Sequence, residues 1–286
     1  MRILRGRLMK LNSKTRKTGD WIQSKYQFRC KIQKIVDVPK TYFYGTDLIK
    51  IRRNLTKHNE FVMKPNHLSR GIGIRVLKRD GDFWIDINGE KLTLKDLVDE
   101  CAVMMRVKRY KGVKAILIEE KINTHPKLNP NGFADMRFIY YYDRFLWCTG
   151  RFGNKSSKGY GNTNRGATFG SYIAGKHVSD SRFITSGKVP KEIPFFDEMV
   201  LTGQKVSKLF GYVFMSVDMT VDCQGKIKVI ESEQMPQIQY YLTDFGVDWI
   251  NKIIGKNKKI DPNPIKIKKS TKGLSSYFPI KVRKAK

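Results

Sequence analysis

The sequence contains few of the residues that build disulfide or zinc frameworks. Its four cysteines, Cys30, Cys101, Cys148 and Cys223, include no C-x-x-C pair, and its four histidines are equally dispersed. Zinc ligands cluster at short spacings, so we expect reduced thiols and no structural zinc. A run of 18 apolar residues is also missing, and the amino terminus lacks an apolar core, which argues against a membrane span or a secretory leader. We therefore expect a cytoplasmic protein.

Acidic residues are scarce relative to basic ones. The chain has 26 Asp and Glu against 56 Lys and Arg, a net charge of +30, and its pI is near 10.0. Residues 1–60 carry a net +12 and residues 251–286 a net +11, so that 61–250 carry only +7. This distribution predicts a globular body with basic arms that attract a polyanion: nucleic acid, anionic membrane, acidic glycan or acidic peptide. With 286 residues, 40% of them hydrophobic, the chain can form one large domain or two closely packed ones.

Apolar segments and turn signals in the body predict antiparallel strands with a few long helices, an α+β fold. Helices are expected over residues 94–105, where Thr93 and Asp96 form a capping box, and over 195–209. Beyond about residue 258 the chain is expected to be extended or disordered. Strands are expected over residues 61–64, 73–77, 83–87, 91–93, 115–118, 136–142, 145–151, 212–221 and 227–230.

Two segments carry residue types that suit a nucleotide. Lys64 ends a predicted strand and precedes a loop with Gly71 and Gly73, whose backbone N–H groups are free to close on phosphate oxygens. The strand predicted at 115–118 ends in Glu119 and Glu120, where backbone groups suit an adenine and a carboxylate suits ribose hydroxyls. Taken alone, each segment is equally compatible with an ordinary strand end.

The strongest pattern lies in the last predicted hairpin. Asp218 lies in its first strand, and Glu231 and Glu233 end the second, on one face because side chains alternate along a strand. Three carboxylates this close require a hard divalent cation or basic neighbours. Mg²⁺ carried by ATP satisfies this requirement through one or two carboxylates plus phosphate oxygens.

In their order along the chain, these segments resemble the motifs of the ATP-grasp superfamily. Within it, they are most similar to sugar-transfer-associated and glutamate-ligase-like proteins. The last metal-binding position of the family motif is usually Asn and is Glu233 here. The resemblance runs from about residue 21 to residue 239 and rests on residues 24–29, 38–42, 61–74, 118–122, 134–137, 151, 162–167 and 217–239.

The resemblance implies an ATP-grasp fold, an α+β fold in which two α+β lobes with antiparallel sheets clasp a nucleotide between them. The charge distribution adds basic N- and C-terminal arms to these lobes. The implied divisions are a basic segment with an opening helix at 1–50, a small lobe at 51–122, a large lobe at 123–250 and a flexible basic tail at 251–286. Family members use ATP to convert a carboxylate to an acyl-phosphate, from which an amine or similar nucleophile displaces phosphate. Some act instead as kinases on hydroxyl groups.

The resemblance also implies contacts to the phosphates of ATP. Lys25 and Lys64 would bind the α- and β-phosphates. Ser69, Gly71 and Gly73 would close over the β- and γ-phosphates. Positioning and charge neutralisation of this kind are the main requirements of phosphoryl transfer.

The resemblance implies two further parts of the nucleotide site. One is the segment that links the two lobes, called the hinge, and the other is a residue beside the metal ion. Glu119, Glu120 and Ile122 would line the adenine and ribose. Asn164 would lie next to the metal ligands.

The implied catalytic and metal-binding residues belong to the large lobe. Arg137 and Arg151 would steady the transferring phosphoryl group. Asp218, Glu231 and Glu233 would bind Mg²⁺, with Mn²⁺ as the alternative ion. The basic arms favour an acidic second substrate, such as an acidic peptide, a nucleic acid or a glycan.

Two other functions compete with this hypothesis. Residues 78–81 match the K-x-D-G signature of covalent nucleotidyltransferases such as nucleic-acid ligases, in which Lys78 would be the nucleophile. Basic and aromatic residues also interleave over 140–147, a pattern that suits a non-catalytic binder of nucleic acid or another polyanion.

Overall fold

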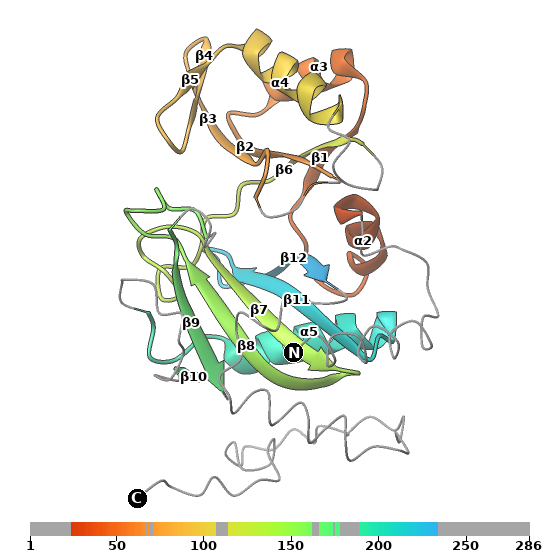
Figure 1. Cartoon of the computed structure of the whole chain (residues 1–286), viewed down its shortest axis with the longest axis vertical. Helices are drawn as coiled ribbons and strands as arrows, with labels where there is room; N and C mark the ends of the chain where they lie inside the picture. The colour runs from red at the N-terminus through yellow and green to blue at the C-terminus, as the bar shows by residue number, and fades with distance from the viewer. Residues whose placement is uncertain are drawn as a thin grey trace, which may run out of the picture.

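Two six-stranded antiparallel sheets form the two lobes of the protein, which lie one above the other in Figure 1. The computed structural model describes residues 24–66, 68, 71–106, 114–161, 166–173, 175–177 and 189–233. No helix within these ranges is both long enough and apolar enough to span a bilayer.

The small lobe is a sheet covered on one face by two helices. In spatial order its strands are β1 (Thr41–Gly45), β6 (Ile116–Glu119), β2 (Glu60–Pro65), β3 (Arg75–Asp80), β4 (Phe83–Asp86) and β5 (Lys91–Leu92). The helices are α3 (Leu48–Lys57), which begins at the N-cap Asp47, and α4 (Leu94–Arg106). The expected capping box is confirmed, because Thr93 Oγ1 accepts from the Asp96 amide and Asp96 accepts from the Thr93 amide.

The large lobe is a second sheet with one long helix beneath it. In spatial order its strands are β10 (Lys176–His177), β9 (Thr168–Ile173), β8 (Arg144–Phe152), β7 (Ala134–Tyr141), β11 (Phe214–Val221) and β12 (Ile227–Glu233). The helix α5 (Phe196–Phe210) lies against one face of this sheet (Figure 1).

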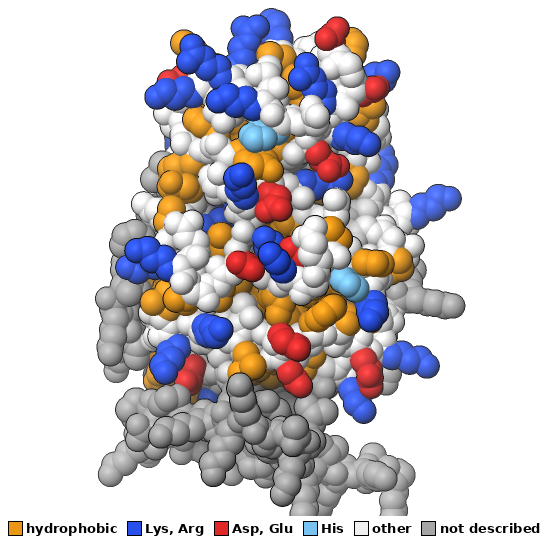
Figure 2. All heavy atoms as spheres, turned by 180° about the vertical axis from the view of Figure 1, so that it is seen from behind, with side chains coloured by type: hydrophobic (Ala, Val, Ile, Leu, Met, Phe, Trp, Pro, Cys, Tyr) orange, Lys and Arg blue, Asp and Glu red, His pale blue; other side chains and the backbone are white. Residues whose placement is uncertain are grey.

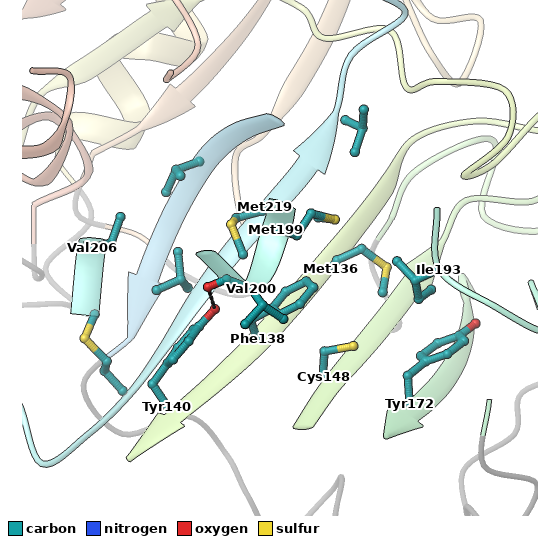
Figure 3. Close-up of a cluster of buried hydrophobic side chains, with 14 of the residues drawn as sticks. Met136, Phe138, Tyr140, Cys148, Tyr172, Ile193, Met199, Val200, Val206 and Met219 are labelled. Atoms are coloured by element: carbon teal, nitrogen blue, oxygen red, sulfur yellow. Dashed lines mark hydrogen bonds between the residues drawn. The ribbon is translucent and has the colours of Figure 1, made fainter. Parts of the chain in front are cut away.

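Alternate side chains of the large sheet build its core against α5. On β7 these are Met136, Phe138 and Tyr140, which point toward Met199 and Val200 of α5 (Figure 3). The Tyr140 hydroxyl donates to the Val200 carbonyl at 3.1 Å, so this buried phenol has a partner. Because side chains alternate along a strand, the intervening residues of β7 and β11 lie on the face of the sheet opposite α5.

A short helix, α2 (Lys25–Ile32), joins the two lobes. Its Phe28 and Ile32 belong to the core of the large lobe. Its N-cap Ser24 donates to the side chain of Asn66, which follows β2 of the small lobe. Figure 1 shows α2 beside the junction of the lobes, where it contacts both.

Most of the expected elements are confirmed. The hairpins β2–β3, β4–β5, β7–β8 and β11–β12 and the helices α4 and α5 lie where the sequence predicts them, with ends that differ by at most three residues. The two-residue turn between β7 and β8 is Tyr142–Asp143 rather than Asp143–Arg144. The helix α3 and the strands β9 and β10 were not expected.

Candidate functional site

The large sheet presents a polar, charged face toward the small lobe. On β7 this face carries Asp135 and Arg137, on β8 Thr149 and Arg151, and on β11 Asp218. Asp218 pairs across the sheet with Arg137 on one side and with Glu231 on the other. The structure therefore brings the sequence-predicted arginines and carboxylates onto one face.

A β-bulge sets the orientation of the two glutamates on β12. Met219 pairs with Val229, but the next residue of β11, Asp218, pairs with Glu231, so Ile230 is the extra residue. Val229 packs in the apolar core, whereas Glu231 and Glu233 lie on the same side as Asp218. Regular alternation alone would have placed Val229 and Glu231 on one face.

Arginines hold the carboxylates of this face together. Arg137 makes a two-pronged contact with Asp218, at 2.8 and 2.7 Å, and reaches Glu233 at 3.0 Å. Arg151 donates to Asp218 at 2.7 Å and also to Asp135. Paired planar contacts of this kind fix the side chains more firmly than single ion pairs do.

A buried trio of charges joins the small lobe to α2. Lys64 lies on the face of its sheet opposite α3 and α4. Its ammonium is 2.5 Å from the Glu119 carboxylate of the neighbouring strand. Arg29 of α2 donates to the other oxygen of Glu119, and it reaches the Ile230 carbonyl of β12 at 3.4 Å. All three side chains are at least 95% buried. One carboxylate thus lies between two cations and balances only one of their charges, which leaves the trio with a net positive charge.

Lys25 joins the two parts of the site. Its ammonium donates to the carbonyl of Leu68, in the loop after β2, at 2.7 Å. The same ammonium lies 3.8 Å from the Glu231 carboxylate of β12. The predicted phosphate loop and the predicted metal ligands are therefore neighbours in space.

The loop glycines adopt conformations that other residues rarely adopt. Gly71 has φ 74° and Gly73 has φ 71°. A Cβ on Gly73 would approach the Met104 sulfur at 3.0 Å and the Pro65 ring at 3.1 Å. Ser69 of this loop, and Asn164 in the large lobe, lie outside the described residues.

The predicted hinge runs from β6 into the large lobe. The Glu120 carboxylate accepts the backbone N–H of Lys40 at 3.0 Å, and its own N–H donates to the Lys40 carbonyl. The Glu120 side chain therefore links the hinge to the segment before β1. Ile122, two residues further along the chain, is half-buried. Glu119 is engaged in the buried trio.

The charges at this site shift several pKa values. Desolvation raises the pKa of Glu231, but Lys25, Lys64, Arg137 and Arg151 outweigh it and hold that pKa at about 2. Burial raises the pKa of Asp135 to about 7 despite the Arg151 contact, and one of its oxygens is buried with no hydrogen-bond partner among the described residues.

The other shifts also follow from burial. Burial, together with the nearby Arg29 charge, lowers the pKa of Lys64 well below its usual value. Burial lowers the pKa of Arg29 to about 10. Desolvation and the charges of Asp218 and Glu231 raise the pKa of Glu233. Perturbation of this many neighbouring groups is typical of a functional cleft.

The donor chemistry of the carboxylates suits a hard cation, but arginines occupy them. Oxygen ligands from Asp and Glu are those that Mg²⁺ prefers. Both oxygens of Asp218 accept hydrogen bonds from arginine here. Within the described residues, no three Asp, Glu, His or Cys side chains are grouped closely enough to hold a metal ion.

The competing motifs lie elsewhere. Lys78 is exposed on β3, where residues 78–81 lead into the tight β3–β4 turn. Of the aromatic residues over 140–147, Tyr140, Tyr141 and Trp147 are buried, so they form no open stacking surface.

The sequence patterns did not predict that Arg29 and Asp135 belong to this site. Arg29 lies one turn after the predicted phosphate-binding Lys25, on the same helix, and that spacing is a signal that could have found it. Asp135 is the second residue of the segment 134–137 and pairs across the sheet with Arg151. Its position two residues before Arg137 puts both side chains on one face.

The fold is similar to that of several solved structures. D-cycloserine synthetase DcsG is similar at a TM-score of 0.52 with 10% identity, over 82% of this chain and 70% of that one. The ATP-grasp ligase PsnB, complexed with a minimal precursor, is similar at 0.48 with 13% identity, over 83% and 60%. D-alanine–D-alanine ligase from Bacillus anthracis, complexed with ATP, is similar at 0.46 with 14% identity, over 80% and 61%.

These identities are low, so the likeness concerns the fold. No protein-family model and no curated protein matches the sequence. The chain spans about 60% of the length of the PsnB structure. Its two antiparallel sheets, with the phosphate-loop motif in one and the acidic hairpin in the other, are arranged as the motifs predict. The likeness to D-cycloserine synthetase DcsG shows that the chain has a similar fold of two α+β lobes.

Proposed function

We propose that the protein is an ATP- and Mg²⁺-dependent ligase that joins a carboxylate to an amine and releases ADP. A substrate carboxylate oxygen attacks the γ-phosphorus of ATP, and the bond to the β-phosphate oxygen breaks to leave ADP. The amine nitrogen then attacks the acyl carbon of the acyl-phosphate, phosphate leaves, and the nitrogen loses a proton. The contact of Lys25 with both the Leu68 carbonyl and Glu231 supports this proposal best, because it unites the two halves of the site.

Each lobe supplies part of the phosphate environment. Lys25 and Lys64 are the cations that would face the α- and β-phosphates, and Gly71 and Gly73 give the loop the turns it needs to approach the β- and γ-phosphates closely. The net positive charge of the trio Arg29–Glu119–Lys64 favours an anion beside it. Adenine would contact the backbone at Glu120 and Ile122, since the Glu120 side chain is engaged with Lys40.

Arg137 and Arg151 would stabilise charge on the transferring phosphoryl group and the acyl-phosphate. Both guanidinium groups are held at fixed positions by Asp218, so little reorganisation is needed when charge develops. Asp135, behind Arg151, orients that side chain further.

Asp218, Glu231 and Glu233 are the residues that would hold Mg²⁺. Glu231 suits the role best, because its low pKa keeps it ionised and its ion pair with Lys25 is long, at 3.8 Å. The ion would neutralise phosphate charge and orient the phosphates. One or two protein carboxylates suffice for Mg²⁺, since phosphates and water complete its shell.

ADP release by the full chain, with Mg-ATP and a pooled extract of metabolites and polymers, tests this proposal. We expect turnover that falls at least a hundredfold in Glu231→Gln and in Lys25→Met, since each removes a preorganised charge. The matched controls are Glu192→Gln and Lys34→Met, which alter exposed residues outside the cleft and should keep turnover. Fractionating the extract then identifies the acceptor, for which the basic charge favours an acidic molecule.

The product distinguishes the alternative reactions. AMP, or a nucleotide adduct found by intact mass and lost in Lys78→Ala, would establish nucleotidyl transfer instead. A phosphorylated hydroxyl with ADP would establish a kinase. Absence of both turnover and ATP binding by calorimetry would contradict the proposal.

A further inference from the structure

The strand β1 leaves one edge of the small sheet open. One side of β1 pairs with β6, and no strand among the described residues pairs with the other side. An edge strand exposes backbone N–H and C=O groups that a further strand can bind. At five residues β1 offers more backbone than β5, the two-residue strand at the opposite edge.

Basic side chains outnumber acidic ones around this edge, where the Glu120 carboxylate also lies near Tyr42 and accepts the Lys40 N–H. His58, the C-cap of α3, stacks on the ring of Tyr42 with centroids 3.7 Å apart, which places the end of α3 against β1. The Lys40 ammonium lies 5.9 Å from the same ring. Burial, followed by the charges of Lys40 and Lys57, lowers the pKa of His58, so both lysines are near it.

The exposed surface of α3 extends this positive charge. Arg52, Arg53 and Lys57 are exposed and have no ion pair among the described residues. By contrast, the neighbouring α4 is nearly balanced by ion pairs such as Lys95–Asp99. Residues 24–66 contain ten Lys and Arg against three Asp and Glu. Viewed from behind, the small lobe at the top carries many basic side chains (Figure 2). We call β1 with Lys40, Arg53, Lys57 and His58 the basic edge.

We propose that the basic edge binds an extended acidic peptide of a partner protein, which adds to the sheet as a strand beside β1. Backbone hydrogen bonds would supply the pairing, and acidic side chains would face Lys40, Arg53 and Lys57. A nucleic acid fits less well, because the Tyr42 ring already contacts His58 and Lys40 and so offers no free platform for a base. The proposal needs no ATP chemistry and goes beyond the ligase function.

Fluorescence anisotropy with the full chain tests the charge requirement. The probe is a fluorescein-labelled peptide of alternating Thr and Glu, at about 0.15 M salt so that long-range attraction is screened. We expect Arg53→Glu/Lys57→Glu to weaken binding by on the order of tenfold or more. The matched control is Lys205→Glu/Lys208→Glu, an equal charge change on the exposed side of α5 in the other lobe, which should weaken binding by less than about twofold.

A second peptide tests the backbone requirement. Methylation of alternate backbone nitrogens keeps the charge and side chains but removes the donors on one edge of the peptide. We expect this peptide to bind at least tenfold more weakly than the unmethylated one, and the unmethylated peptide to slow hydrogen exchange in β1.

Three outcomes would overturn the proposal. If Arg53→Glu/Lys57→Glu and Lys205→Glu/Lys208→Glu weakened peptide binding equally, the peptide would be attracted by the net charge of the protein and not by the basic edge. Unchanged affinity of the methylated peptide would exclude strand addition. Tighter binding of a single-stranded oligonucleotide of equal charge, with the same dependence on Arg53 and Lys57, would assign the surface to nucleic acid. Circular dichroism of each variant confirms that folding is retained.

Discussion

Arg29 and Glu119 form a buried ion pair whose two members come from different lobes. Arg29 lies on α2, whose Phe28 and Ile32 pack into the large lobe, whereas Glu119 ends β6 of the small sheet. Because Glu119 also holds Lys64, the position of the predicted phosphate-binding lysine depends on a helix of the opposite lobe.

Loss of the Arg29 guanidinium should destabilise the protein strongly. Arg29→Met leaves one buried oxygen of Glu119 without its donor while Lys64 still balances the charge, so we expect the free energy of unfolding to fall by about 1–3 kcal/mol. Chemical denaturation measures the change. Lys95→Met, which removes a well-exposed ion pair with Asp99, should cost at most about 1 kcal/mol. Equal costs for the two variants would refute a stabilising role for the interlobe pair.

Glu231 should contribute to acid sensitivity. Its pKa in the folded protein, about 2, lies below the ordinary value of 4.5, so the folded state binds its proton less readily than the unfolded chain. Stability from this group is complete above pH 4.5 and is lost as the pH falls toward 2. Glu231→Gln should therefore lose less stability than the wild type between pH 4.5 and 2, as measured by denaturant midpoints. Parallel curves would contradict the low pKa.

Asp135 should act in the opposite direction. Its pKa of about 7 exceeds the ordinary value of 3.8, so the folded state binds the proton more readily. Its contribution to stability is present below pH 3.8 and is lost as the pH rises to 7. Asp135→Asn should not show this decline. Relative to the wild type, the variant's free energy of unfolding, measured by denaturant midpoints, should therefore rise between pH 3.8 and 7 and change no further above pH 7.

The contact between α5 and the sheet leaves no space for a side chain at Gly203. A Cβ there would overlap the hydroxyl of Tyr140, which is itself tied to Val200 (Figure 3). Overpacking of this kind costs about 1–3 kcal/mol, more than the gain of up to about 1 kcal/mol in helix propensity. Gly203→Ala should therefore lower the thermal midpoint, whereas Leu201→Ala, at an exposed position of the same helix, should change it little.

The sequence predicted the faces of the large sheet better than the contacts between lobes. Side-chain alternation predicted that Glu231 and Glu233 share a face, and the capping pattern predicted the start of α4. The contact of Arg29 with Glu119 joins residues 90 positions apart and leaves no local pattern. Contacts of this kind depend on how the lobes meet, which alternation and capping do not describe.

One missed element had a recognisable signal. The helix α3 has Asp47 at its N-cap and the apolar residues Leu48, Ile51 and Leu55 at helical spacing, yet its many basic residues conceal that pattern. The strands β9 and β10 are different. Gly170 interrupts the apolar pattern of β9, and β10 has only two residues, so neither strand shows a clear period.

The bulge at Ile230 has a consequence for how the last hairpin can form. If Ile230 paired with Asp218 in regular register, Glu231 and Glu233 would turn toward α5 and enter a layer of Met, Val and Phe side chains. Two ionised carboxylates in that layer would be very unfavourable. A hairpin in the wrong register would thus be disfavoured by burial of its own carboxylates. Glu231 and Glu233 therefore help to select the correct alignment of β11 and β12.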